Sequence, residues 1–173
     1  YGVITNKVIE VVLSLAKKYK LKIFGDLQCS SQIGLITKFK NFSLLCPNEK
    51  EARIALQDKD SGLEILSNKL ILNTKCKKLI MKLGAEGFIA YDSISEYSSK
   101  SQSFPALSVN PVDVSGAGDS LLAVMSTSLS TEDNFMSAAA IACCMTAIAV
   151  ENMGNRPIYS DTLKKFLSKI FHY

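Results

Sequence analysis

Residues 113–119 read Asp-Val-Ser-Gly-Ala-Gly-Asp, and they join a strand-like segment to a helical pattern over residues 120–130. Gly116, Ala117 and Gly118 are so small that successive backbone N–H groups can face outward with no side chain over them. A helix that begins here adds partial positive charge at its N-terminus. The stretch therefore predicts an anion-binding turn where a strand ends and a helix begins.

Asp119 ends this turn. A carboxylate is a poor group for holding phosphate because like charges repel, but it can accept a proton. We therefore predict that Asp119 takes the proton of a substrate hydroxyl while the N–H groups of the turn stabilise a transferring phosphoryl group. The alternative is a glycine turn in which Asp119 only complements the helix dipole.

The sequence lacks two other phosphate-binding motifs. A P-loop requires Gly-Lys-Ser/Thr after a second glycine, and this triplet is not in the chain. A dinucleotide fingerprint requires a third glycine where Leu121 stands. A nicotinamide-dependent oxidoreductase is therefore disfavoured.

A second polar pair follows a short apolar run at residues 42–45. Asn48 and Glu51 place an amide and a carboxylate on one side of the first turn of a helix expected to end near Gln57. Such oxygen groups suit Mg²⁺ held through water. The same spacing is that of a capping box, in which the two side chains only satisfy the backbone. Both interpretations stay open.

Residues 82–87, KLGAEG, combine a strand end with two glycines. Gly84 and Gly87 would let a ligand approach the backbone near Lys82, although a plain hairpin turn also fits. Asp26 ends another apolar segment, where a loop-start role is the alternative to a functional one. In a parallel sheet these positions lie at the carboxyl ends of strands, where open α/β sheets bind ligands.

The wider pattern alternates strands with helices. Strands are expected at residues 21–26, 42–45, 77–83 and 88–91, with short irregular strands over residues 92–109. Helices are expected after Thr5 and over residues 48–57, 61–72, 120–130, 134–151 and from Ser160 onward. We therefore predict one α/β domain over residues 1–173, with a mostly parallel sheet flanked by helices.

Composition narrows the functional classes. The 173 residues are 47% hydrophobic, with 20 Lys+Arg against 16 Asp+Glu, and they contain no basic cluster of the kind that binds nucleic acid. The five cysteines are odd in number and lack CxxC spacing, which indicates reduced, intracellular thiols. The single histidine, His172, excludes histidine triads and multi-histidine metal sites.

The longest uncharged run, residues 134–150, is shorter than a bilayer span. We expect a cytoplasmic protein without membrane contact.

Three of these motifs, taken together and in this order, resemble the ribokinase (pfkB) family of carbohydrate kinases. They are PNEKE at residues 47–51, KLGAEG at residues 82–87 and DVSGAGD at residues 113–119. The resemblance covers essentially the whole chain, and it includes Asn152-Met153-Gly154 as the loop that borders adenine. It implies a ribokinase-like fold, with three layers and a Rossmann-like sheet.

The resemblance also implies an activity, the ATP-dependent phosphorylation of a hydroxyl group on a sugar or sugar phosphate. Asp119 would be the catalytic base, and the anion hole would be formed by Gly116, Ala117 and Gly118. Tyr1-Gly2, the segment over residues 21–26 and Val124 look most like the heptose-7-phosphate kinase branch.

The cofactors implied are ATP, Mg²⁺ and a monovalent cation such as K⁺. Asn48 and Glu51 would hold Mg²⁺ through water, and Asp113 would help to form the cation loop. The residues implied for the nucleotide site are Lys82, Gly84, Gly87, Cys143 and Gly154.

The sequence departs from the family pattern in three places. The N-terminal portion with the sugar-recognition glycines and lid strands is not in this chain, so we expect a fragment that carries the nucleotide-binding and catalytic portion. Cys143 stands where an adenine-contacting Asn often occurs, and Leu27-Gln28-Cys29 replaces a proline-lysine type of sequence. A non-catalytic nucleotide-binding or structural module is therefore the alternative function.

If a longer chain normally covers one edge of the sheet, that edge would be uncovered in this chain. The uncovered edge would pair with a second copy and give a homodimer.

Overall fold

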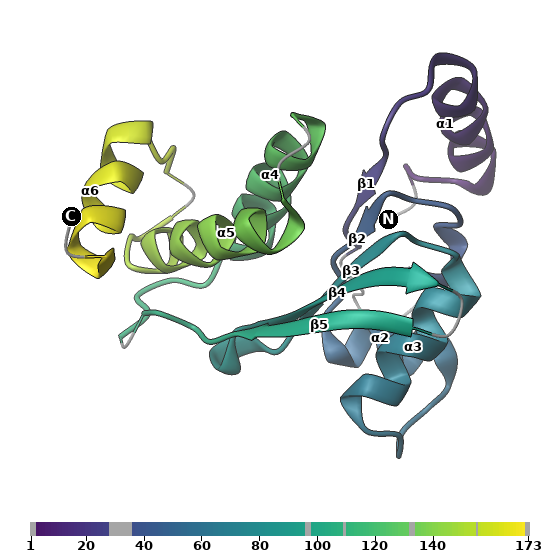
Figure 1. Ribbon diagram of the computed structural model, residues 1–173, viewed down its shortest axis with the longest axis horizontal. Coiled ribbons are helices and arrows are strands. Elements are labelled where there is room, and N and C mark those ends of the chain that lie inside the picture. The colour runs from purple at the N-terminus through teal and green to yellow at the C-terminus, as the bar shows by residue number, and fades with distance from the viewer. Residues whose placement is uncertain are drawn as a thin grey trace. The chain divides into compact units, whose positions relative to one another are not determined.

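The computed structural model describes residues 3–27, 36–95, 98–108, 110–131, 134–154 and 156–171 (Figure 1). Tyr1, Gly2, Gln28, Cys29 and His172, which the sequence singled out, lie outside the described residues. The helices are α1 (Asn6–Tyr19), α2 (Glu49–Leu56), α3 (Leu63–Thr74), α4 (Ala117–Ser130), α5 (Phe135–Val150) and α6 (Ser160–Phe171). The strands are β1 (Phe24–Gly25), β2 (Leu44–Leu45), β3 (Lys78–Lys82), β4 (Phe88–Ser95) and β5 (Ser98–Phe104). Two short 3₁₀ helices, η1 (Ile36–Lys38) and η2 (Gly84–Glu86), complete the described elements.

The strands form a sheet in the order β1-β2-β3-β4-β5. β1 pairs with β2 and β2 with β3, both in parallel, as the sequence predicted. The Leu83 amide donates to the Gly87 carbonyl at 2.8 Å and the Ser93 amide donates to the Lys77 carbonyl at 3.1 Å, so β3 and β4 run antiparallel. Only two residues separate β4 from β5, and so short a connection joins antiparallel neighbours. The sheet is therefore mixed.

Capping and periodicity place the helices close to where the sequence predicted them. The Thr5 side chain accepts a hydrogen bond from the Val8 amide at the start of α1, and Asn134 caps α5 in the same way. α4 begins at Ala117, three residues before the predicted start, so the end of the glycine turn already belongs to the helix.

Two expectations about strands need correction. β1 covers only Phe24–Gly25 of the strand predicted over residues 21–26. The irregular strands predicted over residues 92–109 are instead the end of β4 and a regular β5. The Ser-rich composition hid this pairing because these strands lack the apolar alternation that marks a half-buried sheet.

The described residues group into two compact units. The first comprises the chain up to Met81 together with residues 91–100, and the second comprises residues 82–90 and residues 101–173. In the first, Leu44, Leu45, Leu66, Leu70 and Leu79 are fully buried. The sequence-based prediction of a single domain stays a prediction.

In the second unit the core lies between α4 and α5. Met125 of α4 is fully buried, as are Ala138, Ala139 and Ala142 of α5. These small side chains let the two helices approach closely, and α5 is the helix predicted from the long uncharged run. No helix among the described residues has the length and apolar character needed to cross a membrane.

Candidate active site

The turn before α4 presents free backbone donors. Gly116 caps the helix with φ +76°, a left-handed conformation that glycine adopts without strain. The Ala117 amide donates to the Val114 carbonyl at 3.3 Å, and the Ser120 amide donates to the Gly116 carbonyl at 2.9 Å. In the part of the chain that the structure describes, the amides of Gly116, Gly118 and Asp119 have no hydrogen-bond acceptor. An anion at this point would therefore meet uncommitted N–H groups.

Asp119 lies in the first turn of α4, and its side chain is exposed to solvent. The carboxylate is therefore not packed among apolar side chains. The neighbouring Gly116, Ala117 and Gly118 are half-buried. This placement lets the carboxylate meet a ligand beside the same amides.

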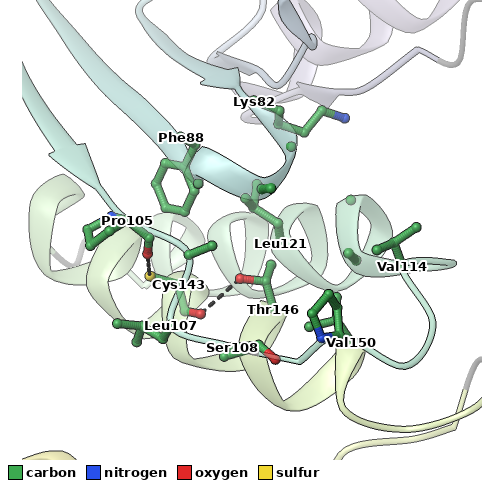
Figure 2. A pocket seen from close by; sticks show the side chains of 18 residues that line it. Lys82, Phe88, Pro105, Leu107, Ser108, Val114, Leu121, Cys143, Thr146 and Val150 are labelled. Carbon is green, nitrogen blue, oxygen red and sulfur yellow. Dashed lines mark hydrogen bonds between the residues drawn. The ribbon is translucent and has the colours of Figure 1, made fainter.

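A pocket of about 500 Å³ lies next to this turn within the second unit (Figure 2). This volume is within the range of roughly 300–1,000 Å³ that small-molecule sites occupy. Its walls come from the β3–β4 turn, the segment after β5, the first turn of α4 and one face of α5. The predicted site residues that line it are Lys82, Gly84, Gly87, Ala117, Gly118 and Cys143.

Sequence reasoning missed much of the pocket's apolar wall. Phe88, Pro105 and Leu107 line it, as do Thr146 and Val150 of α5 (Figure 2). Thr146 and Val150 lie three and seven residues after Cys143, which puts all three on one face of the helix. That spacing is visible in the sequence, but it does not distinguish a pocket wall from a packed core.

The two glycines of the β3–β4 turn have different surroundings. Gly87 has φ +93°, and a Cβ there would lie 2.1 Å from the Phe104 carbonyl oxygen and 2.7 Å from the Ala106 amide nitrogen. Gly84 has φ +62°, and nothing would lie within 4 Å of a Cβ there. Gly87 is thus required by close backbone packing, whereas Gly84 leaves open space at the pocket.

Cys143 joins α5 to the segment after β5. Its Sγ donates a hydrogen bond to the Pro105 carbonyl at 3.1 Å (Figure 2). Burial raises the pKa of the Cys143 thiol to about 11, with the neighbouring Cys144 adding to the shift. The side chain therefore remains a neutral thiol and contributes packing to the pocket wall, not charge.

Asp113 connects the turn before α4 to the turn after α5. Its Oδ1 accepts from the Ser115 amide at 2.9 Å, and its Oδ2 accepts from the Gly154 amide at 3.0 Å. These hydrogen bonds, led by those from Ser115, lower the pKa of the Asp113 carboxyl. Gly154, implied as a neighbour of adenine, does not line the pocket and instead contacts Asp113.

Asn48 and Glu51 form the capping box at the start of α2, in the first unit. The Glu51 amide donates to Asn48 Oδ1 and the Asn48 amide donates to Glu51 Oε2, both at 2.8 Å. Glu51 is buried, at 4% exposure. Both side chains offer oxygen atoms, the ligand type that Mg²⁺ prefers, so the chemistry of the pair suits Mg²⁺ held through water.

The other acidic side chains among the described residues do not complete a metal-binding site. Asp26 accepts a hydrogen bond from the adjacent Leu27 amide at 2.8 Å, which fits the loop-start interpretation. Among the residues that the structure describes, no three His, Cys, Asp or Glu side chains are grouped so that they could hold a metal ion. Mg²⁺ commonly relies on substrate phosphates and water for most of its ligands, so the donor set is compatible with it.

The architecture and the pocket define an α/β protein of ribokinase-like fold, and solved structures show this fold. Ribokinase from Thermotoga maritima matches 92% of this chain with a TM-score of 0.76 and 24% identity. Phosphofructokinase-2 from Escherichia coli in complex with potassium matches 97% of it with a TM-score of 0.78 and 18% identity. This chain covers 53% of each of those two chains.

The chain belongs to the pfkB family of carbohydrate kinases, whose family model matches residues 7–162. The bifunctional protein HldE of Campylobacter jejuni is 29% identical over 168 residues, which are 95% of this chain and 34% of that protein. HldE of Geotalea uraniireducens is 27% identical over 160 residues, which are 91% of this chain and 31% of that protein. The chain thus spans about a third of the length of these curated relatives.

Proposed function

We propose that the protein transfers the γ-phosphoryl group of ATP to a hydroxyl group of a sugar phosphate. The observation that carries this proposal is the set of free amides at the start of α4, beside an apolar pocket and next to the exposed Asp119. Membership of the pfkB family supports the same chemistry.

The proposed mechanism assigns one task to each part of the second unit. The pocket over α5 holds the base and sugar of the nucleotide, because its apolar walls and size suit an aromatic ring system. The amides of the turn, including that of Gly118, stabilise negative charge on the phosphoryl oxygens. Asp119 accepts the proton of the acceptor hydroxyl, whose oxygen forms a bond to the γ-phosphorus while the bond to the β–γ bridging oxygen breaks and ADP leaves.

Two cations belong to the proposal. Mg²⁺ would neutralise phosphate charge, and Asn48 and Glu51 are the residues that would hold it through water. The carboxylate of Asp113 would contribute to a site for a monovalent cation such as K⁺, because it supplies negatively charged oxygen atoms as ligands.

The acceptor class follows from the resemblance to the heptose-7-phosphate kinase branch, so we propose a heptose phosphate. The sequence similarity to HldE proteins, 27–29% identity over 91–95% of this chain, supports this choice. The whole enzyme would act in the cytoplasm, where ATP is available, and a second copy of the chain is the proposed partner.

The assignment of the base is tested by Asp119→Asn. Loss of the proton acceptor should lower kcat by about 10²–10⁴-fold, which is the usual contribution of a general base. Binding of Mg-AMP-PNP, measured by calorimetry, should stay within a few-fold of the unaltered protein because the amides remain. Turnover is measured as ADP release with heptose 7-phosphate, fructose 6-phosphate and ribose as acceptors.

Asp161→Asn is the matched control, because Asp161 is an exposed acid in the first turn of α6 and does not line the pocket. It should leave turnover unchanged. Near-normal turnover in Asp119→Asn would show that another group is the base.

A non-catalytic nucleotide-binding module is the second candidate function. It is favoured by one observation, that the chain covers only 53% of the solved kinase chains it matches. Binding of Mg-AMP-PNP with no acceptor-dependent ADP release from Mg-ATP would support the module, and acceptor-dependent release would support the kinase.

A further inference from the structure

Hydrogen bonds hold the turn before α4 against the end of α5 and the turn that follows it. The Val112 and Asp113 amides both donate to the Val150 carbonyl, at 2.7 and 3.1 Å. The Asp113 carboxylate accepts from the Ser115 and Gly154 amides, at 2.9 and 3.0 Å. We call this arrangement the Asp113 clasp.

The clasp depends on a side chain with two acceptor oxygens. Ser115 lies two residues after Asp113 and Gly154 lies 41 residues after it, so one carboxylate joins a local turn to a distant one. The two N–H groups bond to different oxygens, and asparagine replaces one of these oxygens with an NH₂ donor, so it can satisfy only one of the two N–H groups in this geometry. Alanine satisfies neither.

The clasp joins the chain segments that lead to two walls of the pocket. Val150, at the end of α5, lines the pocket together with Cys143, Thr146 and Ala147 of the same helix. Ala117 and Gly118, at the start of α4, line it from another side. Fixing Ser115 against Gly154 therefore sets where the free amides of the α4 turn stand relative to the α5 wall.

We propose that Asp113 is a positioning residue, whose carboxylate clasp holds the phosphate-binding amides of the α4 turn in register with the base-binding wall on α5. The proposal rests on the proposed kinase function of this pocket. The role belongs to the carboxylate itself and is present without a monovalent cation, which separates it from the cation site proposed above.

The first measurement is amide hydrogen exchange in potassium-free buffer without nucleotide. In Asp113→Ala, the Ser115 and Gly154 amides should both exchange at least about tenfold faster than in the unaltered protein, and in Asp113→Asn at least one of them should, because a charged acceptor is lost. Asp161→Asn should change neither amide. A residue that acted only by binding a cation would show no difference in this buffer, and unchanged exchange would overturn the clasp.

The second measurement compares the binding of adenosine with that of Mg-AMP-PNP by calorimetry in the same buffer. Asp113→Asn should weaken Mg-AMP-PNP about tenfold while adenosine changes less than about twofold, because only the amides that meet phosphate are released. Equal weakening of both ligands, or of neither, would overturn the positioning role. If the unaltered protein binds neither ligand, the proposed function fails, whereas the exchange rates still decide whether the clasp exists.

Discussion

Gly84 and Gly87 show how one residue type serves two purposes within four positions. Both have positive φ, and the sequence motif predicted the same role for both. Gly87 leaves no room for a Cβ because the backbone of residues 104–106 lies against it. Gly84 has open space where a Cβ would lie and it lines the pocket, so its positive φ is the constraint that the structure shows.

This difference predicts opposite outcomes for two alanine substitutions. Gly87→Ala should destabilise the protein by more than about 3 kcal/mol, because backbone atoms must move or the conformation must change. Gly84→Ala should cost only about 1–2 kcal/mol, the cost of a left-handed non-glycine residue, but should weaken Mg-AMP-PNP binding. Urea unfolding and calorimetry measure the two effects. Equal destabilisation by both substitutions would contradict the structure.

At the scale of the elements, the polar pair at the N-terminus of α2 has two interpretations. Its capping box is fully formed, and Asn48 and Glu51 satisfy each other's backbone amides. The stabilising role is therefore present in the structure, and the binding of Mg²⁺ at this pair is an additional proposal.

Substitution of Asn48 separates these roles. Asn48→Ala should lower the free energy of unfolding by about 1 kcal/mol through loss of the cap, and Asn48→Ser should restore most of it because serine also caps well. If Asn48 also supports Mg²⁺, both variants should need more Mg²⁺ for half-maximal turnover. The measurements are denaturant unfolding and a Mg²⁺ titration of ADP release. Wild-type Mg²⁺ dependence in Asn48→Ser would leave capping as its only role.

At the scale of the whole molecule, α1 presents an apolar face to solvent. Its buried side includes Ile9 and Ala16. The adjacent arc of the helix carries further apolar side chains that are 40–59% exposed, and at 100° per residue they form one contiguous stripe. These residues are Val8, Val11, Val12, Leu15 and Tyr19.

We expect the 173-residue chain to self-associate through this stripe, because exposed apolar patches of this kind favour association. The double substitution Val12→Ser and Leu15→Ser should shift light-scattering masses toward the monomer at the same protein concentration. Ile65→Ser, which changes one exposed apolar residue of α3, is the control and should leave the mass unchanged. A strictly monomeric unaltered chain would contradict the expectation.

The sequence by itself determined the local features. Thr5 and Asn48 mark helix starts because a cap acts within three residues. The uncharged run at residues 134–150 became α5, and the glycine turn became the start of α4. The motifs also identified the family, since DVSGAGD and its two companion motifs are short contiguous stretches.

Tertiary structure decided the features that join distant residues. The pairing of β4 with β5 relies on backbone hydrogen bonds that any composition can make, so the Ser-rich sequence did not reveal it. The pocket wall of Phe88, Pro105 and Val150 comes from three separate segments, and the bond from Gly154 to Asp113 spans 41 residues. Such contacts depend on how the chain closes on itself, whereas caps, turns and helical periodicity depend only on neighbours along the chain.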